Sequence, residues 1–109
     1  MDDKVVNGIK ILQLAGRFDA HTAPQVRQWM DVATAAGPAR IAVDLQLVNF
    51  IDSTALAALV QGMKRSRQQN GDLVLFGLQQ PVRIIFELTR LDKAFAILED
   101  ETAALAYFD

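Results

Sequence analysis

The sequence contains no cysteine and a single histidine, His21, so it is poor in the residues that build redox and metal sites. Without cysteine the chain can form neither a disulfide nor a thiolate metal site. A transition-metal site would have to combine carboxylates with one imidazole, and the sequence offers no second cluster of ligands. We therefore expect neither a metal nor a cofactor.

Long apolar runs and an excess of positive charge are also missing. No stretch of the 109 residues approaches the roughly 20 apolar residues of a membrane span, and the acidic N-terminus leads into no signal peptide. The formal net charge is −2, which makes nucleic acid and anionic membranes poor candidates for a partner. With 51% hydrophobic residues the composition suits a packed core, so we expect one soluble, cytoplasmic domain.

The usual motifs of enzymes are absent as well. Neither a Gly-x-Gly-x-x-Gly turn nor a Gly-x-x-x-x-Gly-Lys loop occurs, so nucleotide phosphates have no recognisable binding loop. A small serine hydrolase would need Ser53 and His21 to meet Asp19 or Asp52. A nucleophile elbow requires glycines two residues before and after the serine, whereas this chain has isoleucine and alanine there. We therefore predict no catalytic residue, and the hydrolase remains a remote alternative.

The apolar pattern alternates between the periods of strands and of helices. Asn7-Gly8 is typical of a tight hairpin turn, and Pro24 and Pro81 suit first helical turns. The expected strands are 5–6, 9–15, 40–45, 73–76 and 95–98, with Gly16 ending the second. Four helices are expected. The first starts at Thr22 and stops at Gly37-Pro38, the second covers 53–69, the third begins near residue 80, and the fourth covers 99–108.

This order is β-β-α-β-α-β-α-β-α. Strands joined through helices need crossover connections, which favour a parallel sheet, while the short first strand pairs antiparallel with the second. The sequence thus predicts an α/β domain over residues 1–109, with a mixed, mainly parallel sheet of about five strands and helices packed on it.

The junction at residue 53 is the most informative point of this pattern. The first residues of the stretch 43–56 have the pattern of a buried strand, and helical spacing begins at Ser53, so Ser53 should lie at a helix N-terminus beside a strand exit. Such edges of α/β sheets are where ligands and partners bind. Asp19 follows what should be the neighbouring strand. A plain capping role for the Asp-Ser-Thr run is the competing interpretation.

The sequence also resembles a STAS domain of the bacterial anti-sigma-factor antagonist family over nearly its whole length. The matching segments are GRFDAHTA at 16–23, FIDSTAL at 50–56, GDLVL at 71–75 and PVR at 81–83, followed by Leu91 and Phe95. Two positions depart from the pattern, since Ala55 and Arg90 stand where many relatives have glycine.

The resemblance implies a regulator in a partner-switching circuit. Such a protein, when unphosphorylated, binds a serine kinase that also sequesters a sigma factor, and phosphorylation by that kinase releases it. A phosphatase of the PP2C type then resets it. By position the phosphorylated residue is Ser53, and Asp19, Asp52 and Thr54 accompany it in the partner-binding site. Related domains also serve as unphosphorylated scaffold subunits of transporters and signalling complexes, which is the alternative.

Overall fold

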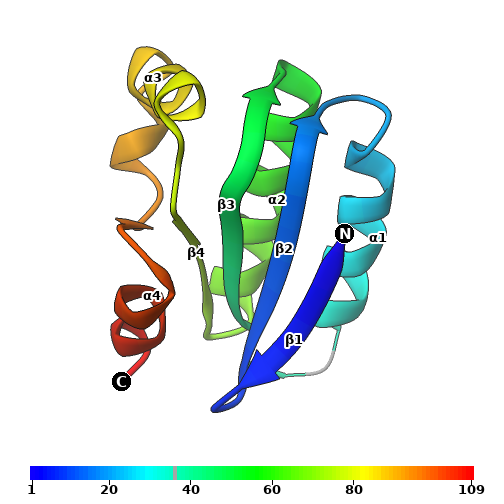
Figure 1. Ribbon diagram of the computed structural model, residues 1–109. Helices are drawn as coiled ribbons and strands as arrows, with labels where there is room; N and C mark the ends of the chain where they lie inside the picture. The colour runs from blue at the N-terminus through cyan, green and yellow to red at the C-terminus, as the bar shows by residue number, and fades with distance from the viewer. Residues whose placement is uncertain (36) are drawn as a thin grey trace.

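The computed structural model describes residues 1–35 and 37–109, and strands alternate with helices along the chain (Figure 1). The strands are β1 (Asp2–Val6), β2 (Ile9–Phe18), β3 (Arg40–Ile51), β4 (Asp72–Phe76) and β5 (Ile97–Leu98). The helices are α1 (Ala23–Ala33), α2 (Ser53–Gln68), α3 (Gln80–Leu88) and α4 (Glu101–Tyr107), and a 3-10 turn, η1 (Leu91–Lys93), precedes β5.

The five strands form one sheet in the order β1-β2-β3-β4-β5. β1 is antiparallel to β2, and the remaining pairs are parallel. Asn7 and Gly8 form the hairpin turn with φ angles of 54° and 79°, which an Asn-Gly pair adopts at low cost. The predicted α/β class, element order and mixed, mainly parallel sheet are confirmed.

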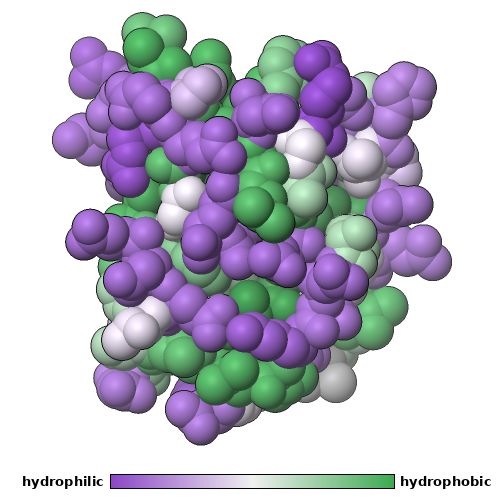
Figure 2. Space-filling view, in the orientation of Figure 1, coloured by the Kyte–Doolittle hydropathy of each residue, from purple (hydrophilic) through white to green (hydrophobic). Residues whose placement is uncertain are grey.

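Helices cover the two faces of the sheet unequally. α1, α2 and α3 pack on one face, where their apolar residues join those of β2, β3 and β4 in a large core. α4 packs on the opposite face over a smaller cluster that includes Ile11, Val74 and Phe76. Figure 2, which views the molecule from the side of that second face, shows polar side chains interspersed with several small apolar patches. On α3, Ile84 and Leu88 are exposed. Over the described ranges, every helix is too short or too polar to cross a bilayer.

β2 and β3 extend further than the sequence predicted. The expectation that Gly16 ends the second strand was wrong, because β2 continues to Phe18 through irregularities in its pairing with β3. Gly16 has a φ of +74°, and without a Cβ it turns the backbone at the irregularity without breaking the ladder. β3 likewise runs on to Ile51 rather than stopping at residue 45. Both strands therefore end directly at the predicted site.

Both ends of α1 differ from their predictions. Thr22 occupies the N-cap position, but its hydroxyl bonds to the backbone of Asp19 and caps no amide of α1. The helix ends at residue 33, four residues before Gly37-Pro38. There the Thr34 hydroxyl donates to the Met30 carbonyl oxygen at 2.8 Å, which satisfies a carbonyl in the last turn.

The C-terminal elements are shorter than expected. Phe95 lies outside β5, which begins at Ile97. Its side chain is buried and packs edge-to-face on Phe86, with ring centres 5.7 Å apart. α4 begins two residues later than predicted, since the Asp100 carboxylate caps it by accepting the Ala103 amide.

A polar cluster holds the end of α4 to the start of β4. The Tyr107 hydroxyl donates to Asp72 Oδ2 at 2.7 Å, and Arg67 Nε lies 3.0 Å from Asp72 Oδ1. The hydrogen bond to Asp72 raises the pKa of Tyr107 above its ordinary value, and partial burial and the negative charge of Asp72 act in the same direction. This cluster therefore fastens the only helix on the second face among the described residues.

Candidate functional site at the ends of β2 and β3

The register of β2 and β3 brings the two acidic residues together. Phe18 and Ile51 are paired at the ends of these parallel strands, so Asp19 and Asp52 are the next residue on each. The Asp52 amide donates to the Phe18 carbonyl oxygen at 3.3 Å, which joins the two strand exits. The prediction that Asp19 and Asp52 follow adjacent strands is confirmed.

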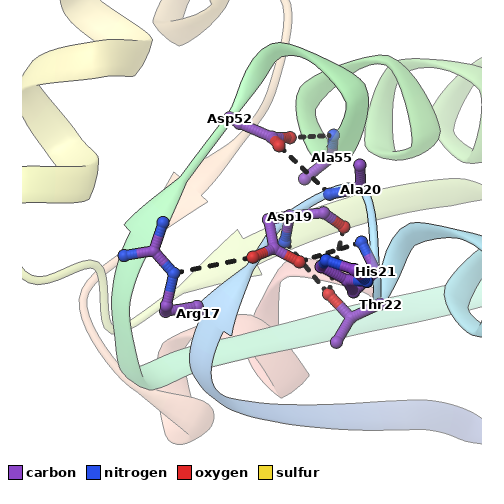
Figure 3. Close-up of polar contacts among 7 residues, drawn as sticks. All are labelled: Arg17, Asp19, Ala20, His21, Thr22, Asp52 and Ala55. Atoms are coloured by element: carbon purple, nitrogen blue, oxygen red, sulfur yellow. Dashed lines mark hydrogen bonds and ion pairs between the residues drawn. The ribbon is translucent and has the colours of Figure 1, made fainter.

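Asp52 is the N-cap of α2, and its side chain serves two segments (Figure 3). Its Oδ1 accepts the Ala55 amide at 2.9 Å, and its Oδ2 accepts the Ala20 amide at 3.1 Å. The first bond satisfies an amide at the start of α2 that has no partner within the helix. The second fastens the loop before α1 to the start of α2. Asp52 therefore fixes the position of the neighbouring Ser53.

Asp19 organises the loop that follows β2 (Figure 3). Its Oδ1 accepts the His21 amide at 2.9 Å, and its backbone bonds to the Thr22 hydroxyl. Its Oδ2 lies 3.5 Å from Arg17 Nε, so an adjacent cation offsets part of its charge. The side chain of Asp19 is 17% exposed, which leaves it able to face an incoming group.

Ser53 is the first residue of α2, and both Ser53 and Thr54 are exposed. The capping role considered for the Asp-Ser-Thr run belongs to Asp52, and the Ser53 side chain takes no part in it. Among the described residues neither hydroxyl makes a hydrogen bond, and the amides of Ser53 and Thr54 have no acceptor. The start of α2 thus presents two unpaired amides and the positive end of the helix dipole together with an exposed hydroxyl.

Sequence reasoning assigned no role to Arg17 and Phe50, although both lie in the segments that carry the family resemblance. The Arg17 guanidinium carbon lies 3.8 Å from the centre of the Phe50 ring, a cation–π geometry. Phe50 is 37% exposed, and Leu47 on the same strand is 55% exposed. A cation stacked on an aromatic ring therefore lies beside Asp19 at the same edge of the sheet. Periodicity could not find it, because the contact joins two strands.

The arrangement that a hydrolase requires is not formed. Within residues 1–35 and 37–109 the His21 imidazole hydrogen bonds to neither Ser53 nor a carboxylate, and its recorded bond to Asp19 uses the backbone amide. The same residues hold no group of three or more histidine, aspartate or glutamate side chains placed to bind a metal ion. The site offers instead an exposed hydroxyl, two positioned carboxylates and unpaired amides.

Comparison with known proteins identifies the family to which the chain belongs. The sequence matches the STAS domain family over residues 1–104. The chain belongs to that family. This STAS domain is 37% identical over 84 residues to the anti-sigma-B factor antagonist of Listeria monocytogenes, which covers 77% of this chain and 74% of the relative.

Solved structures show the same fold. An anti-sigma factor antagonist from Mycobacterium paratuberculosis superposes with a TM-score of 0.87 at 24% identity, covering 97% of this STAS domain and 90% of that chain. The Bacillus protein SpoIIAA in its phosphorylated form gives a TM-score of 0.77 at 19% identity, covering 99% and 98% of the two chains. The fold and the family that the resemblance implied are therefore confirmed, and the names of these relatives agree with the role it implied.

Proposed function

We propose that this STAS domain is an anti-sigma-factor antagonist that works by partner switching. When unphosphorylated it binds a serine kinase that is also an anti-sigma factor, and phosphorylation of Ser53 by that kinase releases it. The observation that carries the proposal is the exposed Ser53 hydroxyl at the first position of α2, with capping assigned to Asp52. The names of its relatives support the same role.

The placement of Ser53 explains why the fold would tolerate a phosphate there and why the phosphate would release the partner. A phosphoserine adds about −1.5 to −2 charges at pH 7. At the N-terminus of α2 the helix dipole favours that charge by about 0.3 to 1 kcal/mol, so the fold should survive modification. Together with Asp19 and Asp52 the phosphate forms a concentrated negative patch, which repels negative charge on a bound partner by about 1 to 3 kcal/mol near a surface. The loss in affinity is then about ten- to a few hundredfold.

The remaining components of the circuit follow from this assignment. The domain supplies no catalytic residue, because the kinase transfers phosphate from ATP and a PP2C-type phosphatase removes it. Asp19, Asp52 and Thr54 form the partner-binding site with Ser53. A circuit that consumes ATP and ends at a sigma factor places the protein in the cytoplasm.

Labelled ATP tests the modified residue directly. Purified serine kinases of the anti-sigma type from the source genome are each incubated with the wild-type domain, Ser53→Ala and Thr54→Ala. We expect labelling of the wild type and of Thr54→Ala, and none of Ser53→Ala. Thr54→Ala is the matched control, because Thr54 is exposed in the same helical turn. Label that persists in Ser53→Ala would show that another residue is the acceptor.

Charge at residue 53 tests the release mechanism. Ser53→Asp should fold normally and bind the kinase about tenfold or more weakly, since an anion replaces the hydroxyl at a site that a helix N-terminus tolerates. Asparagine has the shape of aspartate without its charge, so Ser53→Asn should bind the kinase much more tightly than Ser53→Asp. Equal affinities of the two variants would refute the electrostatic mechanism.

The scaffold alternative makes a different prediction. A scaffold subunit of a transporter or signalling complex would co-purify with a permease or ATPase and would bind it equally well with Ser53 or Asp at this position. The kinase experiments above therefore separate the two functions.

A further inference from the structure

A groove on the surface of α1 and α2 extends from Ser53 along α2. It has a volume of about 560 Å³, and its lining includes Ser53 with Ala57, Val60 and Leu91 on an apolar floor. Arg27 of α1 and Lys64 of α2 also line it. The groove thus begins at the proposed phosphorylation site and continues away from the two carboxylates.

Arg27 and Lys64 are the charged residues of this lining. The ion pairs recorded within the described part of the chain use Lys4, Arg17, Arg65 and Arg67, so the charges of Arg27 and Lys64 are uncompensated there. Asp31, one helical turn after Arg27, is engaged by Arg65. An acidic protein of net charge −2 therefore presents an apolar groove of positive charge next to Ser53.

We propose that this groove receives an apolar, carboxylate-bearing segment of the kinase, and that phosphate on Ser53 displaces it chiefly by neutralising Arg27. The inference rests on the proposed function and adds a contact surface and a second cause of release. A phosphoserine of about −1.5 to −2 charges is enough to offset the single positive charge of a groove cation that lies close to it. Release then follows from loss of attraction as well as from repulsion by the negative patch that the phosphate forms with Asp19 and Asp52.

The two cations lie at different distances from residue 53 along the helices. Lys64 is eleven residues further along α2, which corresponds to about 16 Å at 1.5 Å per residue. Arg27 is only one turn into α1, and the start of α1 is tied to the start of α2 through Ala20 and Asp52. At physiological salt, charges separated by more than about 8 Å are largely screened from each other. Phosphate on Ser53 should therefore neutralise Arg27 much more than Lys64.

A double-mutant cycle with the kinase that labels Ser53 tests the proposal. Affinity is measured by calorimetry for the wild type, Arg27→Gln, Lys64→Gln and Arg40→Gln, each with Ser53 and with Ser53→Asp. Arg40→Gln is the matched control, because it removes one positive charge from an exposed residue at the opposite end of β3. Circular dichroism confirms that each variant is folded.

We expect Arg27→Gln and Lys64→Gln each to weaken binding about two- to fivefold, as is typical of exposed charge pairs, and Arg40→Gln to leave it unchanged. In the Arg27→Gln background, Ser53→Asp should lose less affinity than in the wild type. In the Lys64→Gln and Arg40→Gln backgrounds the loss should equal that of the wild type.

Two outcomes would overturn the inference while leaving the proposed function intact. One is kinase binding that is insensitive to both Arg27→Gln and Lys64→Gln while Ser53→Asp still releases the domain. The other is an effect of Ser53→Asp that is the same in every background, which would assign release to the negative patch at residue 53, Asp19 and Asp52 alone. Absence of any labelled Ser53 would instead contradict the proposed function itself.

Discussion

Replacing Asp52 and Ser53 separately by alanine tests whether Asp52 stabilises the start of α2 while Ser53 contributes little to stability. In Asp52→Ala the Ala55 amide loses its cap, which typically costs about 1 kcal/mol. The bond to the Ala20 amide is lost as well and contributes about 0.5 to 1.5 kcal/mol. We therefore expect the free energy of unfolding to fall by about 1.5 to 2.5 kcal/mol and Tm by about 6 to 10 °C for a domain of this size. Ser53→Ala should change the free energy by less than about 0.5 kcal/mol, because the hydroxyl is exposed.

Urea unfolding measures both values. Trp29 of α1 is the single tryptophan of the chain and is half-buried, so its fluorescence can report the transition. Asp52→Asn is the informative intermediate, because asparagine caps helices about as well as aspartate but can offer only one acceptor oxygen. It should recover the capping contribution and lose the bond to Ala20. If Ser53→Ala proved as destabilising as Asp52→Ala, Ser53 would be a structural residue and the argument for an available hydroxyl would fail.

Two further predictions concern stability away from the site. Arg90 adopts a left-handed φ of 62° at the position where the resemblance led us to expect glycine, so Arg90→Gly should stabilise the domain by about 0.5 to 1 kcal/mol in urea unfolding. Tyr107 has a raised pKa in the folded state, so its contribution to stability is complete below the ordinary value of 10.0 and is lost as pH rises through the folded value. Unfolding measured between pH 8 and 11 should therefore show a smaller alkaline loss of stability in Tyr107→Phe than in the wild type.

Each of these predictions has a clear contrary result. A destabilising Arg90→Gly would mean that the arginine side chain makes contacts that outweigh its backbone strain. If Tyr107→Phe lost as much stability at alkaline pH as the wild type, the hydrogen bond to Asp72 would not raise the pKa of Tyr107 in the folded protein.

Much of the fold could be predicted because its signals are local. The Asn7-Gly8 turn, the alternation of periods and the crossover rule depend on residues near one another in the chain, and together they lead to the mixed sheet. The limits of β2 and β3 could not be predicted in this way. Their last residues pair across irregularities at Gly16, and such pairing depends on the neighbouring strand rather than on local propensity.

The sequence by itself determined the class of the fold, its element order and the place of Ser53 at a strand-to-helix junction, because backbone propensity and apolar spacing act over about a dozen residues. Only the tertiary structure decided which member of the Asp-Ser-Thr run turns inward as the cap. Aspartate, serine and threonine all satisfy helix amides, and the choice of Asp52 depends on the Ala20 amide across the junction. The Arg17–Phe50 contact and the groove that joins Arg27 to Ser53 likewise bring together residues far apart in the chain, which requires the packing of whole elements.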